Sequence, residues 1–296
     1  ALRIVTERER EIDEFVPVEY WSLDADLAKI TGKKPTKADM FRASILKIHG
    51  KKAELSTGEE ANAVVQALDG ATWKIDTVQR RQSKRNPSAP FTTSTLQQEA
   101  SRKLGYSVRR TMQIAEELYE GVDLGAEGTQ GLIAYMRTDS LNISTSIQHQ
   151  ARDVIADMFG SEFVPEKLPF YRTKSKGAQE AHEAIRPTDP SRAPMAVKAR
   201  LSGPQFKLYN LIWQRFMASQ MAPARLDNTR VDINAGSEAE VASGKTPYVF
   251  RATGSIVTFK GWMAVYQMGR DEGDTDELDK GALPELSEGE LLDLLK

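Results

Sequence analysis

The stretch WKIDTVQRRQSKRNPSAPFTTSTLQQEASRKLGYSVRRTMQIAEELYEG, residues 73–121, changes from one kind of periodicity to another. Residues 73–79 alternate between apolar and polar side chains, which is typical of a strand. Residues 80–90 are basic and contain proline, which favours a connector. From residue 94 onward, apolar side chains recur at helical spacing. The sequence therefore predicts that a β region gives way to a helical region near residue 89.

Two helices joined by a three-residue turn are predicted within residues 94–121. Ser94 begins the first helix in the manner of a capping box, and Gly105 ends it. Ser107 caps the second helix, which continues to Gly121. Basic residues flank the turn, namely Arg102, Lys103, Arg109 and Arg110. This arrangement favours a helix-turn-helix unit, although an ordinary helical hairpin fits the spacing equally well.

Both regions beside this helical pair have a β-rich pattern. An antiparallel hairpin is expected from residues 20–25 and 41–46, followed by a helix at 59–68. An apolar helix at 204–220 leads into further strands at 229–234, 249–252 and 256–259. The predicted fold is α+β and multidomain, with an antiparallel β domain interrupted by an inserted, mainly helical domain.

The chain divides into four predicted parts. Residues 1–14 are the end of a helix from another domain, and residues 15–88 are the first part of the β domain. Residues 89–203 are the inserted helical domain, and residues 204–296 are the second part of the β domain, with an acidic loop at 271–280. Both ends of the sequence look cut, so we expect a piece of a longer protein.

Three smaller elements are predicted inside the inserted domain. They are a strand at 132–136 that has the character of a wing, a helix from Ser144 to Gly160 with Ile147, Ala151, Val154 and Met158 facing inward, and a short helix at 179–185 that Pro187 stops.

Composition narrows the class of protein. The chain has 296 residues, of which 40% are hydrophobic, so each of two domains can bury a core. No run of 18 apolar residues occurs, and we therefore expect no membrane contact and a cytoplasmic location. The sequence contains no cysteine and only three histidines, which excludes disulfides and argues against a zinc site.

The charge is unevenly distributed along the chain. The net charge is −2, but residues 271–296 hold ten acidic and two basic side chains, which leaves 38 basic and 32 acidic residues elsewhere. Residues 74–113 contain nine Lys or Arg and only two acidic residues. This local excess suits phosphate groups, although a solvated basic face without a ligand has the same composition.

Three short stretches occur in the order found in bacterial type IA DNA topoisomerases. They are APFTTSTLQQ at 89–98, GLIAYMRTDS at 131–140 and AHEAIRPTD at 181–189. Residues 1–10, 208–213 and 221–224 are similar as well, so essentially the whole chain resembles this family. The resemblance implies that the β domain forms an arch and that the inserted domain, related to helix-turn-helix proteins, carries the nucleophile.

The resemblance assigns roles to Tyr135, Arg137 and His182. The sequence pattern adds Arg186, which would share a helical face with His182, and the basic pair Arg109 and Arg110 beside the predicted turn. A lone tyrosine in a strand is usually a packing residue, but the family pattern makes Tyr135 the nucleophile that becomes linked to a 5′ phosphate of DNA. Arg137 lies two residues on and would face the same side of an extended segment, where it can hold the scissile phosphate. Substrate binding is expected of His182, Arg186, Arg109 and Arg110.

No residue of this chain is expected to bind a metal. The HEAIR stretch lacks the second histidine of the zinc pattern HExxH, because Arg186 stands there. Family members bind Mg²⁺ with carboxylates of a separate acidic (Toprim) domain, and Asp274 and Asp276 lie in an acidic loop that does not match it. We therefore expect Mg²⁺ only in the intact enzyme. Ala134 replaces the threonine that commonly precedes the tyrosine.

The resulting hypothesis is an ATP-independent topoisomerase that relaxes negatively supercoiled DNA by single-strand passage. Its expected partners are single-stranded DNA, negatively supercoiled duplex and the missing domains of the same polypeptide, and the isolated chain should be inactive. A non-catalytic helix-turn-helix module that binds DNA is the alternative from another class. A decatenating relative or the topoisomerase half of reverse gyrase is an alternative within the same class.

Overall fold

The computed structural model describes residues 2–30, 32, 34–172, 182–267, 269 and 281–296. The chain forms two compact units. Unit 1 contains Ala1–Arg81, Asn228–Ile256 and the C-terminal stretch, and unit 2 contains Gln82–Asp227 and a stretch that begins at Val257. These bounds differ from the predicted domain bounds at residues 89 and 203. The domain division of the intact protein therefore stays a prediction.

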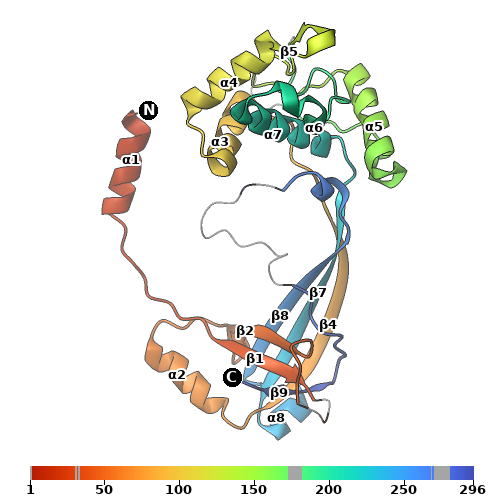
Figure 1. Ribbon diagram of the computed structural model, residues 1–296. Coiled ribbons are helices and arrows are strands. Elements are labelled where there is room, and N and C mark those ends of the chain that lie inside the picture. Colours follow the sequence, from red (N-terminus) through yellow and green to blue (C-terminus); the bar gives the residue numbers. More distant parts are fainter. Residues whose placement is uncertain (1, 31, 33, 173–181, 268, 270–280) are drawn as a thin grey trace. The chain divides into compact units, whose positions relative to one another are not determined.

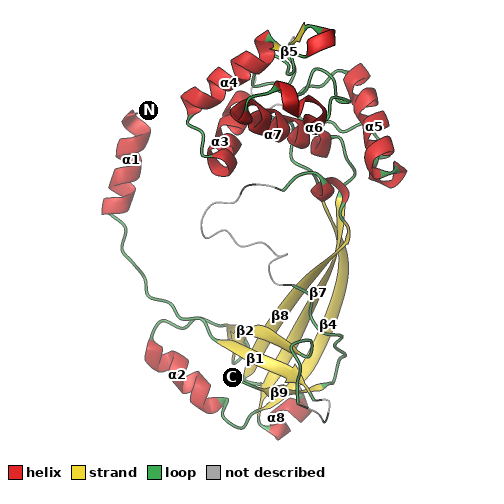
Figure 2. Ribbon diagram, in the orientation of Figure 1, coloured by secondary structure: helices red, strands yellow, loops and turns green. Residues whose placement is uncertain are grey.

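Unit 1 is built on a seven-stranded sheet (Figures 1 and 2). Its strands are β1 (Asp24–Lys29), β2 (Met40–Ile48), β3 (Lys51–Lys52), β4 (Thr72–Arg85), β7 (Ala224–Gly236), β8 (Tyr248–Phe259) and β9 (Leu291–Leu294). The order is β1-β9-β4-β7-β8-β2-β3, and β1 also pairs with β2. The sheet therefore closes on itself, which leaves few strand edges unpaired.

The predicted antiparallel hairpin is confirmed. β1 pairs with β2 from Asp24↔Ser44 to Ala28↔Met40. β1 begins four residues later than we predicted from residue 20, and Trp21 instead forms an isolated bridge with Leu55. The α+β class and the large antiparallel sheet are confirmed as well.

Three helices accompany the strands of unit 1. They are α1 (Leu2–Asp13), α2 (Gly58–Ala67) and α8 (Glu238–Ser243). α2 has a complete capping box at Thr57 and Glu60 and buries Ala61 and Val64 against the sheet core. That core contains Leu27, Trp73, Ile75, Val231, Ile233 and Phe250. In contrast, α1 buries none of its residues.

Several strands, β4, β7 and β8 among them, are longer than the sequence pattern indicated. β4 continues through most of the predicted connector to Arg85, because its exposed positions tolerate basic side chains and proline first occurs at Pro87. β8 spans both strands predicted between residues 249 and 259. The gap between them contains Gly254, where a Cβ atom would lie 2.8 Å from the Leu283 side chain. Glycine therefore allows a close approach there and does not end the strand.

Helices dominate unit 2. They are α3 (Thr93–Leu104), α4 (Val108–Glu120), α5 (Thr145–Phe159), α6 (Pro194–Val197) and α7 (Gly203–Ser219), accompanied by the small hairpin of β5 (Val122–Asp123) and β6 (Thr129–Gln130). α7 packs on α3, α4 and α6. It is the helix predicted at 204–220, and it lies in the helical unit and not in the unit that holds the sheet.

The ends of these helices partly match the expected signals. Gly105 ends α3 in the left-handed conformation with φ 65°, and Ser107 caps α4, as predicted. The cap of α3 is Thr92, which forms a capping box with Thr95, so the prediction of Ser94 was wrong. Ser94 has a residue type that suits a cap, but Thr92 comes earlier in the chain, and its side chain accepts a hydrogen bond from the Thr95 N–H.

The inward face of α5 was also predicted incorrectly in part. Its buried residues are Gln148, Ala151 and Ile155, whereas Met158 is exposed. Gln148 is buried because its amide donates to the Pro169 carbonyl at 2.8 Å. The predicted acidic loop at 271–280 and residues 179–181 of the predicted short helix lie outside the described residues. In the described part of the chain, no helix is long and apolar enough to cross a membrane.

Candidate functional site

Three segments of unit 2 that are distant in sequence lie side by side. Phe91 forms an antiparallel bridge with Ile185, and Ile133 forms one with Pro187. The Ile185 N–H donates to the Phe91 carbonyl at 2.8 Å, and the Ala134 N–H donates to the carbonyl of Arg186 at 2.8 Å. Each of the three motifs at 89–98, 131–140 and 181–189 therefore contributes backbone to one small assembly.

These bridges replace two predicted elements. Residues 132–136 form an extended segment with a single isolated bridge, so the predicted strand or wing is absent among the described residues. Residues 182–185 are not helical, and Ile185 pairs with Phe91 instead. Neither segment forms a regular element, because each finds its backbone partners in another short segment.

Thr93 fixes the segment that contains Arg137. Its hydroxyl donates to the Met136 carbonyl at 2.7 Å and accepts from the Thr138 N–H at 2.8 Å. The Thr93 N–H, which has no partner inside α3 because it is in the first turn, donates to the Thr138 carbonyl at 2.9 Å. The start of α3 thus holds the backbone on both sides of Arg137.

Gly131 lets the segment before Tyr135 approach the end of α4. The Leu132 N–H donates to the Leu118 carbonyl at 2.7 Å. A Cβ atom on Gly131 would lie 2.6 Å from the carbonyl oxygen of Tyr119, closer than any side chain tolerates. Glycine is required at this position by the close approach of two backbones.

The Tyr135 ring is next to two other rings. The Tyr119 ring meets it edge to face, with centroids 5.4 Å apart and planes at 66°. The His182 ring is tilted against it, with centroids 5.9 Å apart and planes at 32°. Tyr135 is nevertheless 40% exposed. Its ring is therefore oriented by aromatic contacts while the residue stays accessible from solvent.

Arg137 faces the same helix as Tyr135. Its Nη2 atom lies 3.6 Å from Oε1 of Glu116, and the arginine side chain is 61% exposed. Glu116 and Tyr119 are three residues apart on α4 and so occupy neighbouring positions on its surface. The expectation that Tyr135 and Arg137 face one side agrees with these contacts. Because the ion pair is exposed, it holds Arg137 only weakly.

Arg186 is held by neighbouring protein groups. Its Nε donates to Glu183 Oε2 at 2.9 Å, Nη2 pairs with the same oxygen, and Nη1 donates to the Pro187 carbonyl at 2.9 Å. The guanidinium is only 12% exposed. Glu183 Oε1 also accepts from the Ser144 N–H at 2.5 Å, at the start of α5. This geometry favours a supporting contribution of Arg186, which ties the segment after His182 to α5.

The pKa of Glu183 reflects these contacts. Burial by itself raises the pKa of this carboxyl, but the hydrogen bonds from Arg186 and Ser144 outweigh burial, and the pKa lies below its ordinary value. The carboxylate is therefore charged at neutral pH and remains the partner of Arg186.

Arg109 and Arg110 do not join the cluster around Tyr135. Both are exposed in the first turn of α4, and the Arg110 guanidinium lies 4.5 Å above the Tyr106 ring. Tyr119 is ten residues beyond Arg109, which corresponds to roughly 15 Å along a helix. Any DNA contact made by this pair is therefore distinct from contacts made beside Tyr135.

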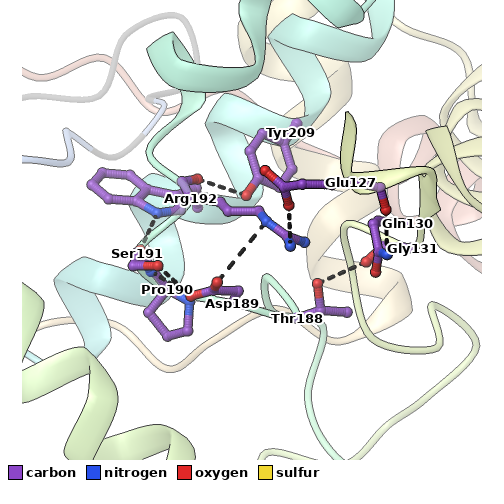
Figure 3. A network of polar contacts seen from close by, with 10 residues as sticks. Glu127, Gln130, Gly131, Thr188, Asp189, Pro190, Ser191, Arg192 and Tyr209 are labelled. Atoms are coloured by element: carbon purple, nitrogen blue, oxygen red, sulfur yellow. Dashed lines mark hydrogen bonds and ion pairs between the residues drawn. The ribbon is translucent and has the colours of Figure 1, made fainter. Parts of the chain in front are cut away.

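A polar network holds the chain that follows Arg186 (Figure 3). Thr188 Oγ1 donates to the Gly131 carbonyl at 2.7 Å, and Arg192 Nη2 donates to Glu127 Oε2 at 2.8 Å. The Tyr209 hydroxyl of α7 donates to the Arg192 carbonyl at 2.8 Å. Burial raises the pKa of Tyr209, which keeps this phenol a donor. The network ties the residues before Tyr135 to α7.

Sequence reasoning missed the side chains that support this site. They are Thr93, Glu116, Tyr119 and Glu183. No role was expected of Glu116 or Tyr119, whose partners lie in another segment, and Thr93 and Glu183 were noted only as parts of the stretches at 89–98 and 181–189. Among the residues that the structure describes, no group of three or more His, Cys, Asp or Glu could hold a metal ion.

The three motifs, their convergence and the aromatic contacts of Tyr135 agree with one class of protein. The chain belongs to the DNA topoisomerase family, whose family model matches residues 1–296. The DNA topoisomerase 1 of Xylella fastidiosa strain 9a5c is 45% identical over 297 residues, which cover 98% of this chain and 34% of that protein. The DNA topoisomerase 1 of strain Temecula1 / ATCC 700964 is 45% identical over 298 residues, with the same coverage.

A solved structure agrees with the sequence relatives. Full-length topoisomerase I from Thermotoga maritima matches with a TM-score of 0.71 and 32% identity, over 99% of this chain and 42% of that chain. The resemblance to bacterial topoisomerases is thereby confirmed. The chain spans about a third of the length of the curated relatives it matches.

Proposed function

We propose that this chain supplies the nucleophile of a type IA DNA topoisomerase. The intact enzyme cuts one DNA strand, holds it through a 5′-phosphotyrosine link, passes a strand through the gap and reseals the break, and so relaxes negatively supercoiled DNA. The observation that carries the proposal is the accessible Tyr135 ring, in contact with the Tyr119 and His182 rings, with Arg137 paired to Glu116 on the same helix as Tyr119.

The proposed cleavage step is a transesterification. The Tyr135 oxygen attacks a phosphorus of single-stranded DNA as the phenol gives up its proton, and a new P–O bond forms. The bond from phosphorus to the 3′ oxygen breaks, and that oxygen takes up a proton and leaves as a hydroxyl. One phosphodiester replaces another, so the reverse reaction reseals the strand without ATP.

Arg137 is proposed to hold the scissile phosphate. Negative charge builds up on the phosphate oxygens during attack, and a fixed guanidinium stabilises that charge. The exposed pair with Glu116 at 3.6 Å is weak enough for a phosphate to replace the carboxylate. Glu116 thus keeps Arg137 on the correct side of α4 before DNA arrives.

The remaining candidates are proposed to contact the strand at a greater distance or to support the site. His182 lies against the Tyr135 ring and is proposed to contact a neighbouring phosphate. Arg186 is proposed to act through its bonds to Glu183 and Pro187, which position His182. Arg109 and Arg110 are proposed to bind the backbone of DNA along α4, where electrostatic contacts depend on salt.

Mg²⁺ is proposed only for the intact enzyme, with its carboxylate ligands in a separate domain. The described residues of this chain do not provide a ligand set, so no step here passes through the metal. We further propose a cytoplasmic, nucleoid-associated location and no relaxation of DNA by residues 1–296 alone.

The test uses a chimaera, which is the X. fastidiosa strain 9a5c relative with its matching segment replaced by residues 1–296. The chimaera is mixed with end-labelled single-stranded DNA and Mg²⁺, denatured and examined for a protein–DNA adduct. We expect an adduct on the 5′ phosphate that disappears in Tyr135→Phe. Tyr119→Phe is the matched control, because it removes the hydroxyl of the neighbouring ring and should not prevent adduct formation.

Two outcomes would contradict the proposal. An adduct that persists in Tyr135→Phe would assign the nucleophile to another residue. If the unmodified chimaera forms none while the intact relative does, the chain is a non-catalytic module that binds DNA.

A further inference from the structure

A group of buried polar side chains lies in unit 2 beneath the segment that precedes α3. Glu99 of α3 is 4% exposed, Arg215 of α7 is 7% exposed, and Tyr266 is 1% exposed. Lys103 joins them, with its Nζ 3.9 Å above the Tyr266 ring and 3.7 Å from Glu99 Oε2. Buried charges are uncommon unless they are paired, so this group needs an explanation.

The hydrogen bonds in the group run in one direction. Arg215 Nη1 donates to the Tyr266 hydroxyl at 3.4 Å, and that hydroxyl donates to Glu99 Oε2 at 2.6 Å. The Gly269 N–H also donates to Glu99 Oε2, at 3.3 Å. Burial, followed by the hydrogen bond to Glu99, raises the pKa of Tyr266, so the phenol stays protonated and the chain of donors stays intact.

On its other side, the Arg215 side chain contacts the segment at residues 89–91. Its Nε donates to the Ala89 carbonyl at 2.6 Å, and its guanidinium lies 4.9 Å from the centre of the fully buried Phe91 ring. A guanidinium is planar and its N–H donors point in fixed directions. These contacts therefore fix both the position and the orientation of the backbone at residues 89–91. A lysine cannot reproduce this geometry.

Two backbone hydrogen bonds connect residues 89–91, which Arg215 contacts, to the segment that carries Tyr135. The Phe91 carbonyl accepts from the Ile185 N–H at 2.8 Å. The next residue, Arg186, accepts through its carbonyl from the Ala134 N–H, also at 2.8 Å, directly before Tyr135. His182, which contacts the Tyr135 ring, lies three residues before Ile185. A shift of residues 89–91 would therefore displace the rings of both Tyr135 and His182.

Stability alone is a poor explanation for the group. Apolar side chains of similar volume often stabilise a core as well as a buried ion pair does, because charges lose hydration on burial. The buried charges do provide a single, directional position for a backbone carbonyl. We propose that Arg215 is a positioning residue for strand cleavage: through Ala89 and Phe91 it sets the placement of His182 and Ala134, and thereby the attack geometry of Tyr135.

This inference rests on the proposed function and is tested in the chimaera, which must first form the adduct with Arg215 present. The variant Arg215→Met keeps an unbranched, flexible side chain, shorter than that of arginine, and removes all its donors. We expect single-turnover cleavage to slow by about ten- to a hundredfold, as for displacement of a reacting group by about 1 Å. Affinity for the same single-stranded oligonucleotide should stay within about twofold, since Arg215 is buried.

The matched control is Arg152→Met. Arg152 of α5 also donates to a backbone carbonyl, that of Pro165 at 2.6 Å, and forms no hydrogen bond or ion pair with the described residues of the three motif segments. Its loss should leave the cleavage rate unchanged. Tyr266→Phe is a milder variant that removes only the hydroxyl between Arg215 and Glu99, and we expect it to slow cleavage less than Arg215→Met while leaving the protein folded.

Two results would overturn the inference while leaving the proposed function intact. One is a cleavage rate in Arg215→Met and Tyr266→Phe equal to that of Arg152→Met. The other is a parallel loss of rate and DNA affinity in Tyr266→Phe, which would indicate general disruption. Should Arg215→Met fail to fold, the rate and affinity of Tyr266→Phe decide the question alone.

Discussion

Tyr135 is oriented by contacts that do not use its hydroxyl. Tyr119 and His182 touch the ring, and ring contacts restrain its plane through shape and quadrupole interactions. A nucleophile benefits from this arrangement, because its oxygen keeps its lone pairs for the reaction. The supporting ring of Tyr119 should therefore matter more than the hydroxyl of Tyr119.

Replacing Tyr119 tests this distinction. Tyr119→Ala removes the edge-to-face partner and should slow adduct formation in the chimaera by about two- to tenfold, because an aromatic pair contributes about 0.5–1.5 kcal/mol to orientation. Tyr119→Phe should stay near the unmodified rate. Single-turnover cleavage measures both variants. Equal rates for alanine and phenylalanine would remove the ring contact from the mechanism.

Glu116 should weaken DNA binding while it holds Arg137. Glu116→Gln removes the competing negative charge, so affinity for a single-stranded oligonucleotide should rise by about two- to threefold at low salt and lose this gain at high salt. Titration at two ionic strengths measures the effect. Glu120→Gln on the same helix is the control for net charge. A gain of the same size in the control would show that proximity to Arg137 is irrelevant.

At the level of elements, the segment that carries Tyr135 depends on one close contact with α4. Gly131→Ala places a methyl group 2.6 Å from the Tyr119 carbonyl, so we expect it to destabilise unit 2 by about 1–3 kcal/mol. Gly203→Ala is the control, because a Cβ atom there meets nothing within 4 Å. Urea unfolding followed by circular dichroism compares the two. A neutral Gly131→Ala would mean that the backbones can separate.

Local patterns predicted most of the regular elements. The helices now seen as α2, α4 and α7 have clear spacing and end signals, and the hairpin of β1 and β2 was predicted from alternation. The errors lie where partners are distant. Ile133 pairs with Pro187 and Ile185 pairs with Phe91 across gaps in the sequence, and no local pattern encodes such pairing.

The candidate site shows the same division. Tyr135 and Arg137 were selected by resemblance to a family, and their surroundings were not predictable. Thr93 and Glu116 belong to α3 and α4, and only the folded chain reveals that they contact the segment around Arg137. Arg215 is further removed still, since it looks like one polar residue in an apolar helix until its burial is known.

For the whole molecule, the closed sheet of unit 1 depends on a four-residue strand. β9 pairs with β1 through Leu27↔Leu294 and with β4 through Trp73↔Leu292. Removing residues 291–296 leaves both neighbours with open edges, and we expect a lower melting temperature and self-association. Removing residues 2–13, which bury nothing, is the control. Thermal unfolding with size-exclusion chromatography measures both, and equal behaviour would contradict the assigned importance of β9.

The position of β9 in the chain also sets an order of events during synthesis on the ribosome. β1 and β4 emerge early, but their shared neighbour emerges more than two hundred residues later. At about 5–20 residues per second, the two edges wait for roughly ten to forty seconds, while the continuous stretch Gln82–Asp227 is already complete. The helical unit can therefore fold first. The sheet is completed last, because β9 is synthesised after both of the strands it joins, β1 and β4.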